Sequence, residues 1–488
     1  MKRPVVAVLA ACVVSAGCAV GPDFHRPDAP SDRSFTSQPT TPTAVADGKA
    51  QRFIEGQPIA ADWWRMLRSP ALDSIVAQAL AGNPGLEAAR ATLRQSQESL
   101  RAGYGVFFPQ VDAKGGASRQ LYNSGVPGFP SNTFNLFTLS GTVSYPLDIW
   151  GGERRQVEVL GAAVDAQRYA LAGAYVMLTA NVVDSVIAQA AYRDEIEATK
   201  ATLALLREQV RVANAQATGG TVPYSNVLSL QSQVASTEAT IPPLEEKIDQ
   251  AADLLAALTG VTPANWRQLP LALSDLHLPE DVPLTVPSQL VRQRPDVLIA
   301  EAELHAANAT IGVATAAMLP NLTLSASYGV NNSAPDSLFS AASQFWSIGA
   351  GVTQPIFHGG ALYHQRKAAI AAHDAAAAQY RQTVLAAFQQ VADALRGLGH
   401  DADALAAQTE AVETAEKAMH LLQANYQAGI GTYLQVLIAD DQYLQAKSGY
   451  VQAVGQRLQD TVAIYVALGG GWWNAPASTD STAPSRSP

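Results

Sequence analysis

The stretch NLTLSASYGV, residues 321–330, alternates between small polar and apolar side chains. Leu322, Leu324, Ala326 and Tyr328 take every second position, with Asn, Thr and Ser between them. Successive side chains of a β-strand point to opposite faces of its sheet, so a period of two predicts a strand. This strand has one apolar face and one face of small polar groups.

Three further segments repeat the pattern, and the four predicted strands cover about residues 110–121, 135–147, 320–331 and 345–357. Alternation over about ten residues is typical of outer membrane β-barrels, whose apolar positions face lipid. The alternative is a half-exposed sheet in a soluble protein. Agreement among four strands, each with small residues on its polar face, favours the barrel.

Four strands are too few to close a barrel, because the smallest barrels have about eight strands. An open edge in lipid would leave backbone groups unpaired, at a cost of several kcal/mol each. We therefore expect copies of the chain to share one barrel, which makes the protein an oligomer.

An internal repeat organises the sequence. Asn83-Pro84 recurs as Arg294-Pro295, and FFPQV at 107–111 recurs as MLPNL at 318–322, at one constant offset along the chain. The sequence therefore contains two copies of one unit, each read as helix, strand, strand, long helix, turn and long helix.

Long helices follow each pair of strands, at residues 151–218 and 359–427, and return at 222–258 and 433–468. The outgoing segments contain no proline, and periodic patterns of this length indicate coiled coils, membrane spans or repeats. Charges recur along them, which argues against a membrane span. Gly-rich turns separate the partners, so we expect two antiparallel coiled hairpins, the first interrupted at Pro242-Pro243.

The N-terminus has the form of an export signal, residues 1–17, with Lys2 and Arg3 before an apolar run. Ser15-Ala16-Gly17-Cys18 resembles a bacterial lipobox, which would place an N-acyl diacylglycerol lipid on Cys18. Cleavage without lipidation is the alternative, because Ser15 stands where most lipoboxes have Leu. Cys12 would be removed with the signal, leaving no disulfide and no thiol metal site.

Composition and motifs argue against other classes of protein. The chain has 42 acidic and 32 basic residues and a net charge of −10, which makes it a poor nucleic-acid partner. Gly469-Gly470-Gly471 lacks the Lys of a phosphate-binding loop, and the eight histidines show no metal-ligand spacing. With no arrangement of nucleophile and base, we predict no enzyme and no cofactor other than the lipid.

Five motifs carry a resemblance that covers nearly the whole mature chain. They are CAVGPDFHRP (18–27), DWWRMLRSPALDSIVAQAL (62–80), YPLDIWGGERR (145–155), QRPDVLIAEAELHAANATIGVATAAMLPNLTLSAS (293–327) and VALGGGWW (466–473). The sequence resembles the outer membrane factor family, the TolC-type and NodT-type lipoproteins that form the exit duct of tripartite efflux pumps. The resemblance implies a mainly α fold with a membrane β-barrel: a homotrimeric α/β-barrel in which four strands per chain build twelve.

Domain limits follow from the repeat. We expect a lipidated N-terminal segment at 18–70, a first repeat at 71–260, a linker at 261–292, a second repeat at 293–470 and a flexible tail at 471–488.

The resemblance also implies a constriction just after the second hairpin turn. Leu434 would form a hydrophobic ring there. Ile438 occupies a place where family members commonly carry Asp, so Asp440 and Asp441 are the candidates for an acidic ring, with a solvated helix face as the alternative. Candidates for contact with a periplasmic adaptor at the hairpin tips are Tyr224, Ser225, Asn226 and Tyr433.

The function implied is a passive outer membrane conduit for small molecules such as drugs or toxic compounds. Its partners would be the adaptor, an inner-membrane RND or MFS transporter and outer membrane lipid in a Gram-negative cell. Alternatives are a TolC-like duct for type I protein secretion and a coiled-coil lipoprotein without a pore.

Overall fold

The computed structural model describes residues 19–32, 34–37, 42–45, 49–123, 131–267 and 270–475. Cys18, the predicted signal at 1–17 and the tail beyond residue 475 lie outside the described residues. The chain divides into two compact units. Unit 1 comprises Met1–Pro27, Ala91–Arg168 and Ile299–Arg381; unit 2 comprises Asp28–Arg90, Tyr169–Leu298 and Gln382–Pro488.

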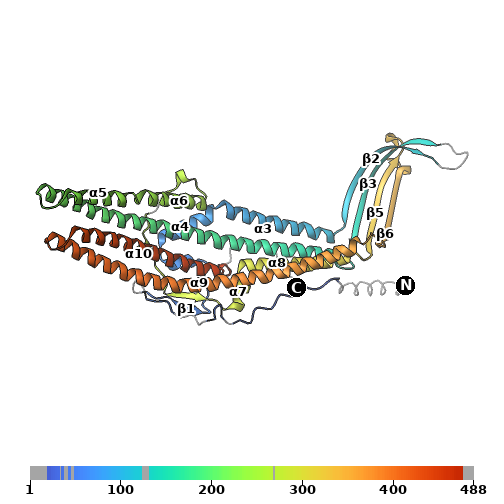
Figure 1. The fold of residues 1–488 in the computed structure, drawn as a ribbon. Helices are drawn as coiled ribbons and strands as arrows, with labels where there is room; N and C mark the ends of the chain where they lie inside the picture. The colour runs from blue at the N-terminus through green and yellow to red at the C-terminus, as the bar shows by residue number, and fades with distance from the viewer. Residues whose placement is uncertain are drawn as a thin grey trace. The chain divides into compact units, whose positions relative to one another are not determined.

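Unit 1 contains one antiparallel sheet of four strands, in the order β2-β3-β5-β6 (Figure 1). The strands are β2 (Gln110–Tyr122), β3 (Asn132–Leu147), β5 (Asn321–Asn332) and β6 (Gln344–Thr353). Single-turn 3₁₀ segments at Pro335–Ser337 and Ala341–Ser343 connect the last two strands. Within the described residues β2 pairs only with β3, and β6 only with β5, so both are edge strands.

The register separates the two faces that the alternation predicts, because directly opposed residues share a face. One row across the sheet is Asp112, Thr142, Ser327 and Ser347. The neighbouring row, on the other face, is Val111, Val143, Ala326 and Ile348.

β6 ends at Thr353, four residues before the predicted end at 357. Pro355 accounts for the difference, because proline has no backbone N–H to donate to a neighbouring strand.

Helices before and after the strands complete unit 1. They are α3 (Pro84–Gly103), α4 (Gly152–Thr218), α8 (Pro295–Ala316) and α9 (Ala361–Gln427), with a 3₁₀ turn at Tyr104–Phe107 after α3. Each of these four α-helices has residues in both units. α4 and α9 begin at Gly152 and Ala361, slightly later than the predicted starts at 151 and 359. The reason is that Gly151 and Gly360, directly before them, have φ angles of +76° and +84°, which are left-handed and not helical.

Unit 2 consists mainly of helices. To its parts of α4 and α9 it adds α2 (Pro70–Gly82), α5 (Tyr224–Glu238), α6 (Ile241–Thr259) and α10 (Tyr433–Ala467). The return helix predicted at 222–258 is thus two helices, because Pro242 and Pro243 fit only the first turn of a new helix. α4 has an apolar stretch long enough to cross a membrane, but 56% of that stretch is buried in protein, as in a packed helix.

The linker and the N-terminal segment contain short elements that the sequence does not predict. β1 (Arg52–Glu55) pairs in parallel with β4 (Asp281–Leu284). The linker also holds α7 (Pro287–Gln293) and 3₁₀ turns at Pro263–Asn265 and Leu273–Asp275, and a further 3₁₀ turn lies at Trp63–Leu67.

Residues 471–475 differ from the flexible tail predicted from residue 471. Trp472–Asn474 form a 3₁₀ turn, and the Trp472 indole N–H donates to the Gln293 carbonyl at 2.8 Å. The Asn474 side-chain amide donates to the Ile59 carbonyl at 2.7 Å. These bonds hold the segment after α10 against the end of α7 and the N-terminal segment.

Candidate functional site

The polar face of the sheet is partly open to solvent in the single chain and is nearly free of charge. Its central rows carry Ser, Thr and Gly, and the Ser327 and Ser347 hydroxyls lie 2.8 Å apart across β5 and β6. Asp112 and Lys114, both on β2, are the charged side chains on this face among the described strands. Such a face binds water readily and attracts neither ion sign strongly.

The opposite face is mostly apolar, with Arg119 of β2 as a charged exception, and it is also uncovered. Trp346, Ile348 and Val352 on β6 are 72%, 79% and 68% exposed, and Val111 on β2 is 73% exposed. Large apolar side chains in a continuous exposed patch mark a surface that contacts lipid or another protein.

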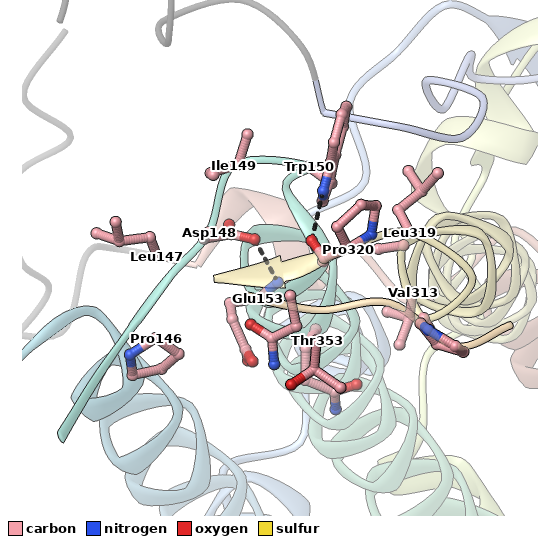
Figure 2. Close-up of a pocket in the computed structure, with 16 residues that line it drawn as sticks. Pro146, Leu147, Asp148, Ile149, Trp150, Glu153, Val313, Leu319, Pro320 and Thr353 are labelled. Carbon is pink, nitrogen blue, oxygen red and sulfur yellow. Dashed lines mark hydrogen bonds between the residues drawn. The ribbon is translucent and has the colours of Figure 1, made fainter. Parts of the chain in front are cut away.

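Where β3 meets α4, the Asp148 carboxylate caps the helix (Figure 2). It accepts hydrogen bonds from the backbone N–H groups of Glu153 and Arg154, each at 3.0 Å, and from the Arg154 side chain at 3.1 Å. The Trp150 indole N–H donates to the Pro320 carbonyl at 2.8 Å, which joins the end of β3 to the start of β5. These bonds fix the strand-to-helix turn.

Beside this turn lies a cavity of about 530 Å³, lined by residues from the ends of β3, α8 and β6 and from the starts of α4 and β5. Asn321 and Thr353, which pair on the polar face of the sheet, belong to its lining. No pattern in the sequence predicts this cavity, because its walls come from segments far apart in the chain.

The first described residues lie on the same turn and on α4 and α8. The Val20 N–H donates to the Trp150 carbonyl at 2.8 Å, and the Asn308 side chain donates to the Pro22 carbonyl at 2.9 Å. The ring of Phe24 stacks on His305 at 4.3 Å, and the buried Arg155 guanidinium pairs with Asp23 at 2.6 Å. The residues directly after Cys18 are therefore held to the strand-to-helix turn.

The first hairpin turn, between α4 and α5, presents two of its predicted contact residues to solvent. Tyr224 and Ser225 are exposed and Asn226 is half-buried. Behind them, Leu206 and Ala213 of α4 pack with Val227 and Leu230 of α5. Tyr433, the fourth predicted contact residue, packs against this cluster and is only partly exposed.

The predicted constriction residues follow the second hairpin turn, which lies between α9 and α10, and they differ in their exposure to solvent. Leu434 is 61% exposed and Ile438 is 48% exposed, while Asp441 is half-buried and accepts a bond from Gln445 one turn along its own helix. Asp440 is 2% exposed. The two adjacent acids therefore have different surroundings, although the sequence grouped them.

Asp440 connects three helices. Its carboxylate accepts a hydrogen bond from the Gln209 side chain of α4 at 2.7 Å and another from Gln423 of α9 at 2.9 Å. Burial raises the pKa of Asp440, and the two hydrogen bonds oppose that rise. Sequence reasoning missed both glutamines, because Gln is common on exposed helix faces and only packing distinguishes these two.

A family model for outer membrane efflux proteins matches residues 75–261 and 286–470. The chain belongs to the outer membrane efflux protein family. The resemblance inferred from the motifs is thereby confirmed.

Relatives of this efflux protein are similar along their whole length. It is 30% identical over 479 residues to the pyoverdine export outer membrane protein OpmQ of Pseudomonas aeruginosa, covering 97% of this chain and 98% of OpmQ. It is 28% identical to the solvent efflux pump outer membrane protein SrpC of Pseudomonas putida, covering 95% and 97%.

Solved structures agree with the fold. The outer-membrane channel OprN is 27% identical with a TM-score of 0.82, covering 93% of this chain and all of OprN. The outer membrane channel MtrE of Neisseria gonorrhoeae, in its open state, has a TM-score of 0.78 at 23% identity, which shows the shared fold alone. The efflux protein is therefore an outer membrane channel that works in efflux pump systems, and it is not an enzyme.

Proposed function

We propose that three copies of the chain close one twelve-stranded barrel and form a passive conduit for small molecules. The observation that supports this most strongly is the four-stranded sheet with two free edges, one polar face and one apolar face. Pairing β2 of one copy with β6 of the next would satisfy both edges, as lipid requires. The polar face would then line the lumen and the apolar face would meet lipid.

The two halves of the chain support a repeated unit within this conduit. In each half, a helix precedes two antiparallel strands, and a 67-residue helix, α4 or α9, follows them. We assign the first repeat to 71–260, the linker to 261–292 and the second repeat to 293–470.

The exported molecules in this proposal are small, such as drugs or other toxic compounds. The names of two relatives support this, because OpmQ is named for pyoverdine export and SrpC for solvent efflux. An inner-membrane RND or MFS transporter would supply the energy through a periplasmic adaptor. The second candidate is a type I protein secretion duct, which the same architecture could serve.

The proposal includes export of the chain, cleavage of the bond between Gly17 and Cys18, and lipidation of Cys18. The bond from Val20 to Trp150 supports it, because a lipid two residues earlier would start at the boundary between strands and helices. That boundary is where the lipid-facing strands end. Labelling with radioactive palmitate tests the site, and a Cys18→Ser protein that labels equally would contradict it.

At the hairpin tips, we propose that Leu434 forms the hydrophobic constriction and that Asp441 supplies its negative charge. The burial of Asp440 gives that residue a different part, which is to hold α4, α9 and α10 together. Tyr224, Ser225 and Asn226 would contact the adaptor, with Tyr433 supporting them from behind.

Two measurements test the conduit. The detergent-purified protein should have the mass of a trimer and should conduct ions in planar bilayers; a monomer without conductance would overturn the proposal. A deletion strain should become sensitive to toxic small molecules. Loss of a secreted protein without any change in drug sensitivity would favour the secretion duct.

A further inference from the structure

The cavity beside the strand-to-helix turn has a size and lining suited to a ligand, and the proposed function gives it no role. Its volume of about 530 Å³ lies within the range of about 300–1,000 Å³ typical of small-molecule sites. All sixteen residues that line it belong to unit 1.

Most of the cavity wall is apolar. Leu147 and Ile149 come from the end of β3, and Val313 and Leu319 come from α8 and the turn after it. Three prolines, Pro146, Pro320 and Pro355, add rigid apolar surface. Such a wall favours an aromatic or aliphatic body over a strongly hydrated ion.

The charged side chains of the lining are all negative. It contains two carboxylates, Asp148 and Glu153, and no Lys, Arg or His. Asp148 is already satisfied, because it accepts two backbone hydrogen bonds and pairs with the Arg154 guanidinium at 3.1 Å. α8, the start of β5 and the end of β6 contribute no charged side chain to the lining.

Glu153 is different, because its carboxylate has no hydrogen-bond or ion-pair partner among the described residues. Burial, and to a smaller extent the negative charge of Asp148, raises its pKa. A half-buried carboxylate without a counter-ion, beside an apolar wall, is stabilised by a cation that brings its own apolar body.

An anion does not fit the same place. The N-terminus of a long helix commonly binds anions through its free N–H groups. Here the N–H groups of Glu153 and Arg154 donate to Asp148, and that of Arg155 donates to the Gly151 carbonyl. The helix start is therefore occupied by the protein's own acceptors.

We propose that this cavity is a contact site for amphipathic organic cations, with Glu153 as the residue that pairs with the positive charge. The apolar body of the ligand would lie against Leu147, Val313 and Leu319. The inference rests on the proposed function, because Asn321 and Thr353 connect the cavity to the polar face that would line the conduit. Export substrates of this class would meet the site on their way out.

Binding of ethidium to the full-length, detergent-purified protein tests the proposal by fluorescence anisotropy. Ethidium is a flat aromatic cation, and anilinonaphthalene sulfonate is an aromatic anion for comparison. We expect saturable ethidium binding that Glu153→Gln weakens at least about tenfold, which corresponds to about 1.4 kcal/mol, and no comparable binding of the anion. Glu98→Gln on α3 is the matched control, since Glu98 is exposed and pairs with Arg101.

A second variant, Val313→Phe, fills the cavity without changing its charge and should also weaken ethidium binding. Binding should fall as the pH is lowered, because protonation removes the charge of Glu153. Equal ethidium affinity in wild type and Glu153→Gln, or in wild type and Val313→Phe at unchanged particle mass, would overturn the inference. Conductance of the wild-type protein tests the conduit separately, so either proposal can fail without the other.

Discussion

The sheet of unit 1 and the hairpin tips of unit 2 both carry polar side chains, but in opposite surroundings. On the sheet, Ser347 is exposed and Thr142 is half-buried, and their hydroxyls bond to Ser327 and to the Asp112 carbonyl in places that water also reaches. Between the tip helices, Asp440 is 2% exposed and both of its carboxylate oxygens accept hydrogen bonds. The sheet face therefore depends on a general property, wettability, whereas the helix contact depends on particular residues that meet.

The largest effect should come from a charge placed on the wrong face of the sheet. Ile348→Arg puts a guanidinium on the apolar face, and Ser347→Arg puts it one residue away on the polar face. A lipid-facing Arg costs about 2–4 kcal/mol near the middle of the membrane, and in a trimer this cost occurs three times. We expect Ile348→Arg to abolish the outer membrane trimer and Ser347→Arg to retain it.

The amount of trimer in isolated outer membranes, measured on gels without heating, distinguishes the two variants. Equal assembly of both would mean that the two faces are not divided between lipid and lumen.

The second effect concerns the exposed side of the hairpin tip. Leu434→Gly should raise single-channel conductance several-fold, because it removes three large side chains from the proposed constriction. Leu421→Gly on α9 controls for the loss of an exposed leucine, because Leu421 is 62% exposed and Leu434 is 61% exposed. Conductance that stays at the wild-type value in Leu434→Gly would remove this residue from the constriction.

The third effect concerns the buried side of the same tip. Asp440→Ala leaves the Gln209 and Gln423 amides without their acceptor, and an unsatisfied buried group costs about 1–3 kcal/mol. Asp441→Ala loses only a bond within one helix, so it should change stability by less than about 0.5 kcal/mol. Thermal denaturation of the purified particles compares the two; an equal loss would show that Asp440 does not join the helices.

Much of the fold could be predicted because its signals are local. Alternation over residues 321–330 requires no knowledge of the rest of the chain, and β5 lies over the predicted segment. Pro242 marks a helix break because its ring restricts the backbone, and Gly429 marks a turn because glycine readily adopts a positive φ. β1 and β4 escaped prediction because strands of four residues are too short to establish a period.

The candidate sites were harder to predict because they depend on which segments meet. Asp440 and Asp441 are equivalent in the sequence, and only the rotation of α10 against α4 and α9 turns one inward. The cavity brings Glu153 near Val313, and no periodicity in the chain relates these two positions.

The smallest effect concerns a buried carboxylate of unit 2 that, unlike Asp440, is not fully hydrogen-bonded. Asp184 of α4 has a buried oxygen with no partner among the described residues. Burial, and to a smaller extent the charge of Asp460 on α10, raises the pKa of Asp184 from 3.8 to about 7. The folded protein therefore keeps a proton that the unfolded chain has lost, so the free energy of unfolding falls as the pH rises from about 4 to about 7.

Asp184→Asn removes this penalty and should make the protein more stable than wild type at pH 8, by a few degrees in melting temperature. The difference should shrink at pH 5, where wild-type Asp184 is mostly protonated when folded. Asp403→Asn on the exposed face of α9 is the control, and its difference from wild type should be the same at both pH values. A variant less stable than wild type at pH 8 would show that the Asp184 carboxylate is satisfied in the assembled particle, as the Asp440 carboxylate is within one chain.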